Sequence, residues 1–186
     1  MHVTPRRAAG SRFQPLAVFL AVLVALGVAA GAGAPSARAR DRPTPSPGLL
    51  EAQTHALVNE HRRAARLPPL AYSPEIAAIA RGHSEAMAAG AVPFGHGGVA
   101  GRRRRIARST PLQGMAENVG VNNAAARRTA RMTVAGWLAS PGHRANIEGD
   151  YDVTGIGIAR SREGAWYFTQ LFVKRGRDDS PRPGPR

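Results

Sequence analysis

The spacing of apolar residues along the chain predicts three helices. The first covers "LLEAQTHALVNEHRRAAR" at 49–66, where apolar positions recur between charged faces. The second covers "SPEIAAIARGHSEAMAAG" at 73–90 and has clear end signals, with Ser73 as the N-cap, a proline directly after it and Gly90 at its end. The third covers "AAARRTARMTVAGWLA" at 124–139, whose arginines fall on one polar side.

Shorter apolar runs predict strands. "ENVGV" at 117–121 is a strand candidate, and "GIGIARS" at 155–161 and "AWYFTQLFVK" at 165–174 flank "REG" as a β-hairpin. Residues 91–116 are rich in glycine and are expected to form a loop. Helices and strands in mixed order predict an α+β layered domain.

The ends of the chain differ in composition from its centre. A basic start, an apolar run over 16–34 and small residues before position 40 predict a signal peptide over 1–39, with an uncleaved membrane anchor as the alternative. Residues 40–48 form a Pro/Arg-rich linker, 49–175 the folded domain and 176–186 a disordered basic tail. We therefore expect a secreted or extracellular protein, or one anchored by its N-terminal segment.

The charge of the chain is strongly positive, with 26 Lys and Arg against 12 Asp and Glu. Nucleic acid is not the expected partner, because no recognisable nucleic-acid motif is present and only 5% of the residues are aromatic. Anionic envelope polymers or lipid headgroups stay open as partners. The run Arg102–Arg105 is expected to be an exposed, solvated turn in a loop, with docking of an acidic partner as the alternative.

The candidate chemistry lies in glycine-rich surroundings. His96 in "FGHGG", Glu117 in "GMAENVG" and His143 in "SPGHRA" form a set that suits Zn²⁺ or another divalent cation with one open position. Spacing alone leaves open whether the three side chains meet, and surface histidines are the alternative. The absence of cysteine excludes disulfides, thiolate metal sites and cysteine nucleophiles.

The remaining polar candidates have structural interpretations. Ser140 precedes proline without a G-x-S-x-G elbow, so capping of a helix is favoured over a nucleophile. His83 lies on the apolar face of its helix and is expected to be a hydrogen-bonded core residue, whereas His55 and His61 are expected to be solvated.

Six segments together resemble the CAP superfamily, also called the SCP-like domain, in its cysteine-free bacterial form. They are "LVNEHRRAARLPPLAYSPEIAAIARGHSEAMAA", "FGHGG", "AENVGV", "VAGWLASPGHRANI", "TGIGIA" and "YFTQLFV", in that order over about residues 50–174. The resemblance implies a three-layer α-β-α sandwich with a central cleft. Family members line this cleft with two histidines and two acidic residues, and some bind Zn²⁺ there.

The resemblance assigns roles to individual residues. His96, Glu117 and His143 match three of the four cleft positions, and the fourth, acidic in the family, falls on Ser140. Asn59 is expected to be a buried hydrogen-bonding residue, and Asn118 and Asn146 are expected to hold loops around the cleft.

Three functions follow as hypotheses. The favoured one is a secreted binding module whose cleft holds a divalent metal and a lipid or peptide ligand. The second is a metal-dependent hydrolase in which Glu117 is the catalytic general base. The third is an envelope interaction protein whose arginines bind anionic polymers.

Overall fold

The computed structural model describes residues 44–176 of the chain. The predicted signal segment 1–39, part of the linker and the tail after Gly176 lie outside these residues. The folded region begins slightly earlier than the sequence predicts, because Ser46 caps the first helix by accepting a hydrogen bond from the backbone N–H of Leu49 at 3.2 Å.

Five helices and four strands make up the described region. In chain order they are α1 (Pro47–Ala64), β1 (Ala71–Tyr72), α2 (Pro74–Ala88), α3 (Val99–Ile106), β2 (Leu112–Asn122), α4 (Ala126–Ala139), α5 (Pro141–Glu148), β3 (Val153–Arg160) and β4 (Trp166–Arg175).

The four strands form one sheet in the order β1-β3-β4-β2. The short β1 pairs with β3 in parallel, whereas β3 with β4 and β4 with β2 are antiparallel. The predicted hairpin is therefore confirmed as β3–β4. Strand β2 is an edge strand with a neighbouring strand on one side only. Residues that cover either face of the sheet can therefore meet along its free edge.

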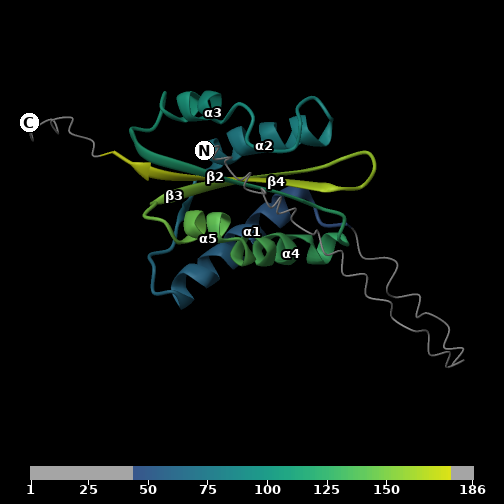
Figure 1. Ribbon diagram of the computed structural model, residues 1–186, viewed down its shortest axis with the longest axis horizontal. Coiled ribbons are helices and arrows are strands. Elements are labelled where there is room, and N and C mark those ends of the chain that lie inside the picture. Colours follow the sequence, from purple (N-terminus) through teal and green to yellow (C-terminus); the bar gives the residue numbers. More distant parts are fainter. Residues whose placement is uncertain (1–43, 177–186) are drawn as a thin grey trace, which may run out of the picture. The chain divides into compact units, whose positions relative to one another are not determined.

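Helices cover both faces of the sheet (Figure 1). Helices α2 and α3 lie on one face, and α1, α4 and α5 lie on the other. Two apolar clusters fill the interfaces: one includes Ile76, Ile79 and Ile106 on the α2 side, and the other includes Trp137 and Phe168 on the α4 side. This arrangement is the predicted α-β-α sandwich.

Two glycines of β3 allow α2 to lie close to the sheet. Gly155 and Gly157 alternate with Ile156 and Ile158, which point to the opposite face. The hydroxyl of Ser84 in α2 donates to the carbonyl of Gly157 at 2.8 Å. A Cβ atom at either glycine would overlap backbone atoms of α2, so helix and strand are in direct backbone contact at these positions.

The helix predictions are confirmed where local end signals are strong. Helix α2 begins after Ser73, whose hydroxyl accepts from the N–H of Ile76 at 3.2 Å. Two helices were not predicted: α3 lies in the expected loop 91–116, and α5 begins at Pro141, directly after Ser140. In residues 44–176, none of the helices is long and apolar enough to cross a membrane.

Candidate functional site

The loop after α2 carries His96, and a buried histidine holds this loop in place. The Nε2 atom of His83 lies 2.8 Å from the carbonyl oxygen of Gly95, to which it donates a hydrogen bond. His83 is only 6% exposed. The expectation of a hydrogen-bonded core histidine is therefore confirmed, and its effect is to fix the position of the neighbouring His96.

Glu117 receives three hydrogen bonds at the edge strand β2. Arg102 donates from Nε to Oε2 at 2.6 Å and from Nη2 to Oε1 at 2.8 Å, and His96 Nδ1 lies 2.9 Å from Oε1. Because a carboxylate only accepts, the proton of the neutral His96 ring is on Nδ1 and its Nε2 keeps a free lone pair. The side chain of Glu117 is 2% exposed and that of His96 is 52% exposed.

The arginine run is therefore not the solvated loop turn that its sequence suggests. Residues 102–105 form part of α3, and only the three that follow Arg102 are exposed. Arg102 and Ile106 are one helical turn apart and are the two buried residues of α3. The helical geometry of α3 directs Arg102 toward Glu117. This difference between Arg102 and the three arginines after it is not visible in the sequence of four identical residues.

Helix α5 brings His143 to the same edge of the sheet from the other face. The amide of Asn118 in β2 donates to the carbonyl of His143 at 3.1 Å, and the amide of Asn146 donates to the side-chain oxygen of Asn118 at 2.8 Å. Asn146 also donates to the backbone carbonyl of Glu117 at 3.2 Å. The two asparagines hold α5 against β2, as the sequence predicts.

His96 affects His143 electrostatically. The pKa of His143 is lowered by burial and, to a smaller extent, by the charge that His96 carries when protonated. His143 is half-buried. His96, His143 and the Arg102–Glu117 ion pair therefore make up one centre at the edge of the sheet, hereafter the centre.

The lowered pKa of His143 makes a contribution to stability that depends on pH. The unfolded chain takes up this proton near pH 6.5, whereas the folded chain takes it up at lower pH, so acidification below about pH 6.5 favours unfolding. We expect His143→Gln to gain stability relative to the wild type between about pH 7.5 and about pH 5. Urea unfolding of both proteins at the two pH values measures this difference, and an unchanged difference would contradict the prediction.

The family resemblance implies a metal here, but the residues present do not fit one well. Both oxygens of Glu117 accept short hydrogen bonds, and the nearest cation is the guanidinium of Arg102. Within residues 44–176, no group of three or more His, Cys, Asp or Glu side chains is arranged to hold a metal ion. The Zn²⁺ site of His96, Glu117 and His143 stays a prediction that this geometry argues against.

Ser140 lies between α4 and α5, where it ends one helix and begins the next. Its carbonyl accepts from the N–H of Arg144 at 2.9 Å, but its hydroxyl makes no capping hydrogen bond to α5. Ser140 is therefore at the predicted capping position without the predicted side-chain contact.

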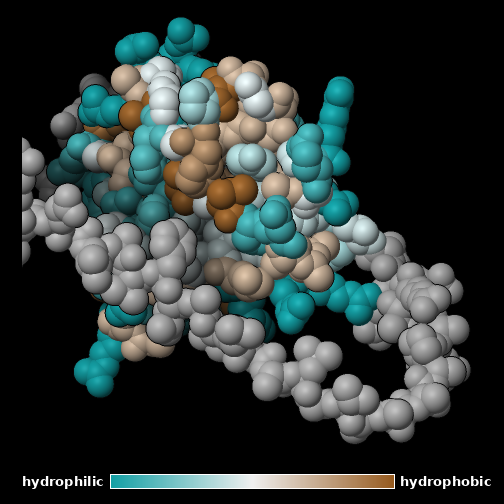
Figure 2. Space-filling model, turned by 45° about the vertical axis from the view of Figure 1, so that its right-hand side comes forward, coloured by the Kyte–Doolittle hydropathy of each residue, from teal (hydrophilic) through white to brown (hydrophobic). Residues whose placement is uncertain are grey.

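A groove of about 300 Å³ lies beside the edge strand, and His143 is one of its lining residues. Its sides are β2 and α4, and its lining residues are Val119, Gly120, Val121, Asn122, Met132, Thr133, Gly136, Trp137, Ser140 and His143. Val121 and Met132 are large apolar side chains that are 44% and 53% exposed. Figure 2 shows apolar side chains gathered on one face of the molecule among polar ones.

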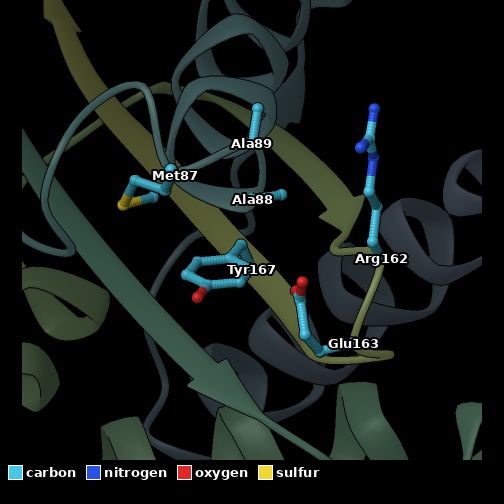
Figure 3. A pocket seen from close by; sticks show the side chains of 7 residues that line it. Met87, Ala88, Ala89, Arg162, Glu163 and Tyr167 are labelled. Carbon is cyan, nitrogen blue, oxygen red and sulfur yellow. The ribbon is translucent and has the colours of Figure 1, made fainter.

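A second hollow, of about 440 Å³, lies where the end of α2 meets the β3–β4 turn (Figure 3). Tyr167, Glu163 and Arg162 are among its lining residues, and the side chain of Arg162 points away from the other two. None of the sequence-predicted site residues lines this hollow, so the groove beside β2 is the better functional candidate.

Two further histidines are paired, not solvated as the sequence predicts. His55 Nε2 lies 2.9 Å from the carbonyl oxygen of Leu70, and His61 Nε2 lies 2.8 Å from a carboxylate oxygen of Glu148 in α5. Asn59 is 5% exposed and binds both backbone groups of Leu70, which confirms its expected role as a buried hydrogen-bonding residue. The partners of both histidines are distant in sequence, which explains the incorrect expectation.

Comparisons with known proteins agree on one family. Residues 55–172 match the sequence model of the CAP, cysteine-rich secretory protein, family. No curated protein sequence matches the chain significantly.

Several solved bacterial structures are similar. An extracellular protein containing an SCP domain from Bacillus anthracis is 27% identical, with a TM-score of 0.54 over 67% of this chain and 40% of that one. A cysteine-rich secretory protein from Staphylococcus aureus is 19% identical, with a TM-score of 0.57 over 72% of this chain and 41% of that one. An outer surface protein from Borrelia burgdorferi is 18% identical, with a TM-score of 0.55 over 68% of this chain and 93% of that one. The chain therefore matches less than half the length of the first and second of these proteins.

Proposed function

Because this chain belongs to the CAP, cysteine-rich secretory protein, family, we propose that it is an exported binding protein whose groove beside β2 takes a small amphipathic, lipid-like ligand. Export is supported by the basic and then apolar N-terminal sequence. It is also supported by the extracellular or outer-surface description of the similar bacterial proteins.

The chemistry of the groove carries the proposal. Its lining from β2 and α4 is mostly apolar, with Val119, Val121, Met132 and Trp137 as the large apolar side chains. Asn122, Thr133, Ser140 and His143 add polar groups to this lining. Its volume of about 300 Å³ is at the small end of the range for ligand sites. A ligand with an apolar body and one polar group matches this distribution of side chains.

The hydrolase hypothesis has less support from the geometry. A general base must have a free lone pair within reach of the proton it removes. The carboxylate of Glu117 is 2% exposed and already accepts from Arg102 and His96. Glu117 therefore acts as a positioning residue for His96, and binding is the function that the site supports best.

A glycine on the groove wall gives a direct test. Gly136 lies in α4, and a Cβ atom at this position would meet nothing within 4 Å. We expect Gly136→Leu to fill the groove and to weaken binding of 11-(dansylamino)undecanoic acid, a fluorescent fatty-acid probe, by about tenfold or more, which corresponds to about 1.4 kcal/mol. A fluorescence titration of the folded variant measures the loss.

Gly82→Leu is the matched control. Gly82 is an exposed glycine inside α2, also with nothing within 4 Å of a Cβ, and it does not line the groove. Its affinity for the probe is expected to equal that of the wild type. Equal affinities of all three proteins, or no binding of the probe to the wild type, would contradict a lipid-like ligand in this groove.

A further inference from the structure

The carboxylate of Glu117 is paired with the positively charged side chain of Arg102. The contact is bidentate: the guanidinium of Arg102 donates from Nε to Oε2 at 2.6 Å and from Nη2 to Oε1 at 2.8 Å. The side chain of Arg102 is 9% exposed and that of Glu117 is 2% exposed. Paired guanidinium and carboxylate groups of this geometry are among the strongest hydrogen-bonded contacts in proteins.

The backbone around Arg102 also holds the guanidinium. Its Nη1 donates to the carbonyl of Gly97 at 2.8 Å, and Nη2 lies 3.4 Å from the carbonyl oxygen of His96. Gly98 ends this turn with a positive φ of 76° and lets the chain bend around the side chain. Arg102 is therefore fixed on several sides, unlike its exposed neighbours Arg103 and Arg104.

A divalent cation bound directly by Glu117 would need a free oxygen of this carboxylate, but Arg102 donates to both oxygens. A cation on the free Nε2 of His96, with Glu117 only orienting the ring, would not need that oxygen but would approach the guanidinium. Both carboxylate oxygens are engaged, and the positive guanidinium would repel a second cation at this short range. The ion pair also leaves His96 with Nδ1 bonded to Glu117 and with Nε2 facing outward as a hydrogen-bond acceptor.

We propose that Arg102 takes the place of a divalent cation beside Glu117, so that the centre of this chain binds its ligand without a metal. The two imidazoles then act as hydrogen-bonding groups toward a polar part of a ligand, such as a hydroxyl or a carboxylate. Arg102 is the residue that determines this selectivity against cations.

Zinc titration calorimetry of the tag-free protein at neutral pH tests the proposal. Arg102→Met removes the charge and keeps an apolar stem, which frees the carboxylate of Glu117. We expect this variant to bind one equivalent of Zn²⁺ at least about tenfold more tightly than the wild type. Arg102→Lys, which keeps the positive charge, is the matched control and is expected to show no such gain.

Removal of His96 distinguishes zinc binding at this site from adventitious zinc binding elsewhere on the protein. The gain is expected to disappear in Arg102→Met/His96→Ala. The proposal is overturned if the wild type already binds one equivalent as tightly as Arg102→Met, or if Arg102→Met folds and gains nothing. Circular dichroism of each variant shows whether it is folded.

A measurement on proteins that keep Arg102 gives an independent test. If Glu117 is not a metal ligand, Glu117→Gln leaves the weak zinc affinity of the wild type unchanged. A tenfold or larger loss in this variant would place Glu117 in a metal site and overturn the proposal, even if Arg102→Met does not fold.

Discussion

Gly157→Ala is expected to destabilise the protein by about 3 kcal/mol or more, because the new methyl group has no space. A Cβ atom at Gly157 would overlap the backbone nitrogen and Cα of Arg81 in α2. Backbone atoms cannot rotate away as the end of a long side chain can. Helix α2 would have to move away from β3 along its whole contact.

The displacement would break specific contacts as well as packing. The hydrogen bonds from Ser84 to the carbonyl of Gly157 and from Arg81 to Glu51 would lengthen, because Ser84 and Arg81 belong to α2. Glu51 is 3% exposed, so a loosened contact leaves a buried carboxylate poorly paired. A loss of this size is a large fraction of the stability of a small domain.

Urea unfolding followed by circular dichroism measures the effect. The matched control is Gly114→Ala in β2, where a Cβ atom would lie 3.5 Å from the Cβ of Lys174, an ordinary contact distance. We expect the control to change the free energy of unfolding by less than about 1 kcal/mol. Similar losses in both variants would show that the close contact between α2 and β3 is not what makes Gly157 necessary.

The parts of the fold with strong local signals could be predicted from the sequence. Ser73 and the proline after it fix the start of α2, and the alternating "GIGI" of β3 fixes which residues face each helix layer. These signals act within a few residues. They therefore remain readable without knowledge of distant parts of the chain.

Helix α3 shows where local signals fail. Its N-cap is Gly98 with no side-chain hydrogen bond, its first turn holds no acidic residue, and four of its eight residues are arginine. The contacts that hold it are those of buried Ile106 and Arg102 with other elements. Glu117 is 15 positions from Arg102, and only the folded chain brings them together.

The candidate site could be predicted only in part, because one of its contacts also joins residues that are distant in sequence. Sequence reasoning selected His96, Glu117 and His143, but it missed Arg102, which decides what Glu117 can do. A signal was available, since Arg102 precedes the apolar Ile106 by four positions and so shares its helix face. Arg62 follows Val58 by the same spacing, and both are buried.

Arg62→Met is expected to cost about 3–5 kcal/mol of stability, because three backbone carbonyls, two of them at the end of α5, lose hydrogen bonds from a charged donor. Its Nη1 donates to the carbonyls of Ile147 at 2.7 Å and Gly149 at 2.9 Å, and its Nε donates to that of Pro68 at 2.8 Å. The side chain is among the largest that are fully buried. A positive charge is favourable at this position, because the end of a helix carries partial negative charge.

The loss should extend to the binding site, because α5 carries His143. Methionine fills a similar volume but leaves the three carbonyls without these donors, so α5 should open locally before the whole domain unfolds. Hydrogen exchange of the α5 amides, compared with that of the β4 amides, measures local opening, and urea unfolding measures the global loss. Arg62→Lys should recover only part of the stability, because one ammonium group cannot reproduce the fork of a guanidinium.

Arg63 provides the matched control for this prediction. It is adjacent to Arg62 in α1 but exposed, so Arg63→Met should change the free energy of unfolding by no more than about 0.5 kcal/mol. If both variants lose the same stability, the effect comes from the basic charge of α1 and not from the carbonyls. If Arg62→Met loses stability without faster exchange in α5, Arg62 stabilises the domain but does not position His143. Only a global loss with selective opening of α5 supports the argument that Arg62 connects the first helix to the binding site.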